Sequence, residues 1–187
     1  MNEQNYSLEK IQHELNYLQL LSRTFRNSAE ASTEIINLEA ILNLPKSTEH
    51  FLADIHGEHE AFQHVLKNAS GDIKRKVREV FSDELSDKEI NTLCTLIYYP
   101  EKKLKLVKQE CENMEEYYTV MLSRLITVCR SISSKYTRSK VRKAMPKGFD
   151  YIIDELLHRQ CEDTNKDEYY KQIIQSIIDL DRADEFI

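Results

Sequence analysis

The chain has 187 residues, of which 41% are hydrophobic and 31% charged, so it can bury a sizeable core and is not expected to be disordered. Only three Gly and three Pro are present, which argues against a loop-rich α/β or all-β architecture over most of the length and favours a mainly α protein. The net charge of −6 argues against a nucleic-acid partner, because such proteins usually carry a basic surface.

Two amphipathic helices are expected at the start of the chain. Apolar residues from Leu8 to Phe25 keep the three-and-four spacing of a helix, and Ser7 precedes them as an N-cap. Asn27 offers a second cap, for a helix that should end before Pro45, because the residue before proline disfavours helix. We treat residues 1–47 as an N-terminal helical pair.

A short strand at residues 49–54 is expected next, and it leads into a corner that could hold a metal ion. On a strand, Asp54 and His56 would project to the same side and could bind one ion. Gly57 allows a sharp turn, and a helix should follow from Glu58. The alternative on spacing alone is an Asp that caps this helix, with His56 packed beside it. Residues 48–71 are taken as one strand–helix unit.

A His-Glu-x-x-His zinc site is excluded in the helix that follows. His59 and His64 are five residues apart, whereas that site needs two histidines four apart on one helical face. The four cysteines are also widely spaced, with no Cys-x-x-Cys pair, so we expect reduced thiols. They are Cys94, Cys111, Cys129 and Cys161.

The second half of the chain is predicted to be helical. Ser86 and Glu89 form a capping box, and Pro100 suits a first helical turn. From Leu104 to Ile132 apolar residues alternate steps of three and four, which predicts one uninterrupted helix with a heptad seam. This seam could pack on other helices of the chain or on a second copy, so a homo-oligomer is left open.

A basic run follows the seam. It comprises Lys135, Arg138, Lys140, Arg142, Lys143 and Lys147. Such a run could bind a phosphate group, or it could be a solvated face that pairs with the acidic residues beyond position 150. A nucleotide effector site is a third alternative, and the spacing does not distinguish the three.

Several stretches resemble the class III (Firmicutes-type) fructose-1,6-bisphosphatases, which belong to the calcineurin-like metallophosphoesterase superfamily. The stretches are Ala31–Leu38, Asp54–Asn68, Leu96–Glu101, Ser133–Ala144 and Arg182–Ile187, in this order over nearly the whole chain. The resemblance implies hydrolysis of fructose 1,6-bisphosphate to fructose 6-phosphate and phosphate in gluconeogenesis. It also implies a sugar bisphosphate substrate and regulation by a nucleotide or a glycolytic metabolite.

The resemblance also assigns roles to individual residues. Asp54 and His56 would be ligands of the first of two divalent ions, with Mn²⁺ the expected metal. Glu58 and His59 would support these ligands from beside the metal corner. The residues that would bind the phosphate that is not cleaved are Arg138, Lys140, Arg142 and Lys143.

The ordered combination of the superfamily's other metal motifs, a Gly-Asp followed by Asp-Arg-Gly and a Gly-Asn-His, does not occur in the sequence. We therefore expect the N-terminal helical part of an α/β calcineurin-like enzyme, with one short strand that carries the first metal motif, and without activity by itself. Residues 72–187 would be a helical insertion, because such a core normally returns to its sheet after one crossover helix. The competing hypothesis is a helical interaction or oligomerisation module without catalysis.

The remaining expectation concerns location. No apolar run approaches the roughly 18 residues of a membrane span, and the polar start Met1–Asn5 does not resemble a signal peptide. We therefore expect a cytoplasmic protein without a membrane partner.

Overall fold

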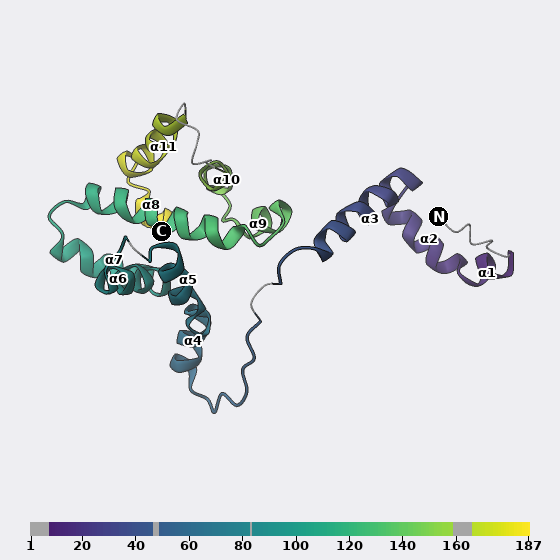
Figure 1. The fold of residues 1–187 in the computed structure, drawn as a ribbon, viewed down its shortest axis with the longest axis horizontal. Coiled ribbons are helices and arrows are strands. Elements are labelled where there is room, and N and C mark those ends of the chain that lie inside the picture. Colours follow the sequence, from purple (N-terminus) through teal and green to yellow (C-terminus); the bar gives the residue numbers. More distant parts are fainter. Residues whose placement is uncertain (1–7, 47–48, 83, 159–165) are drawn as a thin grey trace. The chain divides into compact units, whose positions relative to one another are not determined.

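The computed structural model describes residues 8–46, 49–82, 84–158 and 166–187, which are mainly helical (Figure 1). No strand occurs in these ranges, so the prediction of a mainly α chain is confirmed. The elements are α1 (Leu8–His13), α2 (Leu15–Thr24), α3 (Ser28–Leu42), α4 (His59–Lys67), the 3₁₀ turn η1 (Ala69–Gly71), α5 (Asp72–Val80), α6 (Asp87–Tyr98), α7 (Pro100–Glu110), α8 (Met114–Ser133), α9 (Arg138–Ala144), α10 (Asp150–Leu157), α11 (Asp167–Asp179) and α12 (Ala183–Phe186).

The chain divides into two compact units, Met1–Pro45 and Lys46–Ile187. In the first unit Asn27 caps α3, because its side chain accepts a hydrogen bond of 2.9 Å from the backbone N–H of Glu30. The single helix expected from Leu8 to Phe25 is divided at Glu14 into α1 and α2. Ser7 lies outside the described residues. The further division of the second unit at residue 71 stays a prediction.

The core of the second unit is built around α8. This helix contacts α10 and α11 on one side and α5 and α6 on the other (Figure 1). Among the residues that the structure describes, Val77, Leu93, Leu96 and Leu122 are completely buried. The capping box at the start of α6 forms as expected, since the Ser86 side chain accepts from the backbone N–H of Glu89 and the Glu89 carboxylate accepts from that of Ser86.

The prediction of one helix from Leu104 to Ile132 is wrong. Helix α7 ends at Glu110, the backbone at Cys111 is extended, and α8 begins at Met114. Asn113 caps the new helix by accepting a hydrogen bond of 3.2 Å from the backbone N–H of Glu116. The apolar repeat depends only on the spacing of side chains along the sequence, so it can continue across the break. The Asn113 cap stabilises the start of a new helix there.

The seam nevertheless buries its apolar face within the chain. Its buried members are Leu104, Val107, Tyr118, Met121 and Val128. Leu104, Tyr118, Met121 and Val128 belong to one core with side chains of α5, α6, α11 and α12. Within the described ranges, no helix is both long and apolar enough to cross a membrane.

Residues 49–55 form no strand in this structure, contrary to the expectation for the segment before the metal corner. Asp54 and His56 have positive φ angles of 58° and 50°, which a strand does not contain. A lone strand leaves its backbone N–H and C=O groups without a ladder partner, so nothing in this part of the chain holds the segment in a β conformation. All residues of this segment are exposed to solvent, and the Phe51 side chain is 91% exposed.

Candidate functional site

Asp54 and His56 do meet, although not in the way that a strand would bring them together. The His56 Nε2 and Asp54 Oδ2 atoms are 2.7 Å apart, and the two side chains are 75% and 72% exposed. The left-handed backbone at both positions, followed by Gly57 at φ 74°, curls the segment so that the side chains converge. Helix α4 begins directly after this corner, at His59.

This pair offers one carboxylate oxygen and one imidazole nitrogen, a donor set that fits Mn²⁺, Fe or Zn²⁺. No group of three or more His, Cys, Asp or Glu side chains that could hold a metal occurs among the residues that the structure describes. The corner therefore fits a divalent ion chemically, but with two protein ligands it leaves most of the coordination shell to other groups.

Glu58 and His59 adjoin the corner through their backbones. Glu58 N–H donates to the carbonyl of Ile55 at 3.0 Å, and His59 N–H donates to that of Gly57 at 2.9 Å. Glu58 occupies the N-cap position of α4 without a side-chain cap. Both side chains are exposed, and their support of the metal ligands stays a prediction.

The structure distributes the four expected phosphate-binding residues over different surroundings. Arg138, Arg142 and Lys143 line one hollow of about 680 Å³, together with Ser139, Asp150, Tyr151 and Asp154. Lys140 lies elsewhere, with its Nζ 4.7 Å from the centre of the Tyr136 ring, beside a mostly apolar hollow between α8, α9 and α10. Three of the four cations can therefore act on one ligand.

A chain of two hydrogen bonds links Arg138, at this basic hollow, to His158 and Asp154. Arg138 Nε donates to His158 Nε2 at 2.9 Å, and His158 Nδ1 lies 2.6 Å from the carbonyl oxygen of Asp154. Asp150 and Asp154 place carboxylates in the same hollow as the cations. The hollow is thus of mixed charge, which is compatible with all three interpretations of the basic run.

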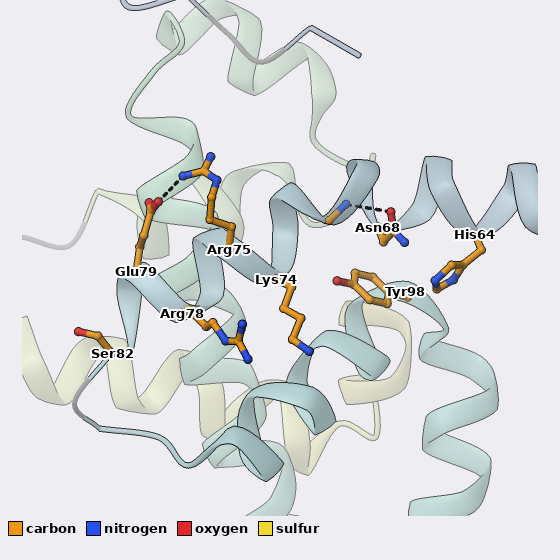
Figure 2. Close-up of a pocket in the computed structure, with 9 residues that line it drawn as sticks. His64, Asn68, Lys74, Arg75, Arg78, Glu79, Ser82 and Tyr98 are labelled. Atoms are coloured by element: carbon orange, nitrogen blue, oxygen red, sulfur yellow. Dashed lines mark hydrogen bonds and ion pairs between the residues drawn. The ribbon is translucent and has the colours of Figure 1, made fainter. Parts of the chain in front are cut away.

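A second hollow, which the sequence analysis missed, lies between α4, α5 and α6 (Figure 2). Its volume is about 700 Å³. The lining residues are His64, Asn68, Gly71, Lys74, Arg75, Arg78, Glu79, Ser82 and Tyr98. Lys74 and Arg78 are four apart on α5, which places them on one helical face, and this spacing was the available sequence signal. Figure 2 shows them extending to the same side of the helix, while Arg75 reaches toward Glu79 on another side.

The tyrosine in this hollow stays protonated over the physiological range. Burial, followed by the neighbouring Cys94 thiol, raises the pKa of Tyr98 to about 12. Burial likewise raises the pKa of Cys94. Tyr98 therefore remains a neutral hydroxyl group rather than a phenolate that would repel an anion.

Comparison with known proteins gives consistent matches. A family model described as Firmicute fructose-1,6-bisphosphatase matches residues 16–187. Proteins named fructose-1,6-bisphosphatase class 3 from Alkaliphilus metalliredigens and Parabacteroides distasonis are 63% identical over 174 residues and 61% identical over 179 residues. A Clostridium beijerinckii protein, named fructose-1,6-bisphosphatase class 3 1, is 59% identical over 187 residues.

These alignments cover 93%, 96% and 100% of this chain, but only 26%, 27% and 28% of the respective relatives. The chain therefore spans about a quarter of the length of the curated relatives that it matches. No solved structure matches it significantly.

Proposed function

Because the chain belongs to the Firmicute fructose-1,6-bisphosphatase family, we propose that it supplies part of a metal-dependent hydrolase that converts fructose 1,6-bisphosphate to fructose 6-phosphate and phosphate in gluconeogenesis. The observation that carries this proposal is the family match over residues 16–187, with identities near 60%. By itself the 187-residue chain is expected to be inactive, because two ligands cannot hold two ions and position an attacking water.

Asp54 and His56 are the residues that would bind a divalent ion, with Mn²⁺ as the proposed metal. Both side chains are largely exposed, at 75% and 72%, so an ion can reach them and replace the 2.7 Å contact between His56 Nε2 and Asp54 Oδ2. When bound, the ion would act as a Lewis acid that stabilises charge on a phosphoryl oxygen. Glu58 and His59, one turn or less away along the chain, would orient these ligands.

We propose that residues 49–54 become a strand when the sheet of a calcineurin-like core is available. Parallel strands need neighbours on their edges, and this chain covers only 27% and 28% of two of its relatives. The exposed apolar side chains of this segment, Phe51 and Leu52, would then be covered. The reaction would take place in the cytoplasm.

Arg138, Arg142 and Lys143 are proposed to bind the phosphate group that is not cleaved, or the phosphate of a regulatory nucleotide or metabolite. Each arginine can pair with phosphate oxygens through two parallel hydrogen bonds. Arg138 and Arg142 are four residues apart on α9, so both lie on one face of the helix. Lys140, on another side of α9, would contribute only through longer-range attraction.

A chimeric enzyme tests the proposal. In the Clostridium beijerinckii relative, the matching 28% would be replaced by this chain. We expect phosphate release from fructose 1,6-bisphosphate, and a loss of at least about 100-fold on Asp54→Ala or His56→Ala. His50→Ala, an exposed histidine of the same segment, is the matched control and should retain activity.

A folded chimera without phosphatase activity would contradict the proposal, as would activity that survives both ligand substitutions. The 187-residue chain gives an independent measurement, because Mn²⁺ should broaden NMR signals near residue 54 in the wild type but not in Asp54→Ala. Phosphate release by this chain alone, abolished by His56→Ala, would mean that it completes its own site.

A further inference from the structure

The hollow between α4, α5 and α6 presents cationic groups that intramolecular ion pairs do not fully neutralise. Lys74 makes no ion pair that the structure records among the described residues. Arg78 Nη2 lies 3.1 Å from Asp87 Oδ1, but that pair is exposed, at 53% and 81%, and such pairs contribute little. An incoming anion could therefore recruit both cations at small cost.

The acidic side chain at this hollow is already engaged. Glu79 binds Arg75 with one carboxylate oxygen and Lys76, at 3.2 Å, with the other. Arg75 also pairs with Asp72, so these charges offset one another on the outer side of α5. Lys74 and Arg78 thus dominate the charge that faces Tyr98 (Figure 2).

The neutral groups of the hollow are also suited to an anion. The side-chain oxygen of Asn68, Oδ1, accepts from the backbone N–H of Gly71 at 3.1 Å, which leaves the side-chain NH₂ as a donor. His64 Nδ1 lies 2.7 Å from the Tyr99 hydroxyl. When that hydroxyl donates to Nδ1, the neutral ring carries its proton on Nε2 and can donate it.

We propose that this hollow binds the phosphate group of a small phosphate ester, held by Lys74 and Arg78 with Asn68 and Tyr98 beside them. Two cations four residues apart on one helical face suit the oxygens of a tetrahedral anion. A volume of about 700 Å³ exceeds what a free phosphate ion fills, so the ligand has a body as well as an anionic head. The proposal does not depend on the function proposed above, because no lining residue belongs to the Asp54 corner or to α9.

Titration of the 187-residue chain followed by two-dimensional NMR tests the proposal, with phenyl phosphate and inorganic phosphate as probes. Sodium chloride at equal ionic strength controls for screening. We expect saturable shifts confined to α4, α5 and α6, with phenyl phosphate binding more tightly than inorganic phosphate. Lys74→Ala and Arg78→Ala should each weaken binding about tenfold or more, whereas Lys74→Arg should retain it.

Lys105→Ala is the matched control, because it removes one positive charge from an exposed position on α7 that does not line the hollow. Equal weakening by Lys105→Ala would overturn the proposal in favour of diffuse charge attraction. Shifts that never saturate, or that lie outside α4–α6, would also overturn it. A thermal melt of each variant confirms folding, and Lys74→Gln replaces Lys74→Ala if the latter unfolds.

Discussion

The Tyr118 hydroxyl donates a hydrogen bond to the carboxylate of Asp184, which lies 66 residues later in the chain. Lys108 pairs with the same carboxylate. The three residues belong to α8, α12 and α7, so one acidic side chain joins the last helix to both sides of the break at residues 111–113. The neighbouring Ala183 is buried, which places α12 in the core and not on its periphery.

Replacing Tyr118 with Phe should lower the free energy of unfolding by about 1 to 2 kcal/mol, because it removes a hydrogen bond to a charged acceptor. Chemical denaturation measures this change. Tyr117→Phe is the matched control, since its buried hydroxyl has no hydrogen-bond partner among the described residues. That substitution should be neutral or slightly stabilising. Equal losses in both variants would show that the Tyr118–Asp184 bond does not contribute.

The same contact should make stability depend on alkaline pH. Burial and then the Asp184 carboxylate raise the pKa of Tyr118 to about 12, above its reference value of about 10. Because the folded state binds the Tyr118 proton more tightly than the unfolded state does, this proton contributes to the free energy of unfolding. The contribution is fully present below pH 10 and is lost as the pH rises through about 12. The stability difference between wild type and Tyr118→Phe should therefore shrink by on the order of 2 kcal/mol from pH 10 to 12. A constant difference would contradict this assignment.

At acidic pH the contribution of Asp184 to stability is lost as the pH falls, whereas that of Tyr118 is lost as the pH rises. Burial alone would raise the pKa of Asp184, but hydrogen bonds from Lys108 and Tyr118 outweigh it and hold the pKa below its usual value. This contribution is present above the reference value of about 3.9 and is lost as the pH falls through the depressed folded-state pKa. Asp184→Asn should lose less stability than wild type as the pH falls below about 4, measured by denaturation at constant ionic strength.

The capping box at α6 should be worth about 1 kcal/mol. Ser86→Ala removes the side-chain acceptor for the Glu89 N–H, while Glu89 still binds Arg124 at 3.0 Å. Ser123→Ala, an exposed position inside α8, should not destabilise, because Ala has the higher helix propensity. Thermal unfolding compares the two variants. If Ser86→Ala lowered the unfolding temperature no more than Ser123→Ala does, the cap would make no contribution to stability.

The sequence predicted the helix starts that depend on local chemistry. Asn27 and Ser86 both cap helices as expected, because a side-chain acceptor three residues before a backbone N–H needs no tertiary partner. The break at Cys111 was missed although Asn113 and Glu116 carried a similar signal. The prediction followed the apolar repeat instead of that signal. The repeat keeps its three-and-four spacing across residues 111–113, so it does not reveal that these residues form a connection between two helices.

The proximity of Asp54 and His56 was predictable from the sequence, but the backbone geometry that produces it was not. Asp54 and His56 come together as expected, yet through left-handed backbone and without a strand. Strand pairing depends on segments distant in sequence, which a local pattern does not supply. The hollow lined by Lys74 and Arg78 was missed because it forms only when α4 and α6 pack near α5.

The apolar face of α8 provides the sharpest test between a core helix and an oligomerisation helix. Leu122 is completely buried among side chains of the same chain, so Leu122→Ala should lower the free energy of unfolding by about 2 to 5 kcal/mol. Val120→Ala, at a position that is 38% exposed, should change it by less than about 1 kcal/mol. Neither substitution should alter the mass measured by light scattering, because the seam is covered from within. A dimer whose dissociation accompanies Leu122→Ala, with stability dependent on protein concentration, would instead assign this face to a second copy of the chain.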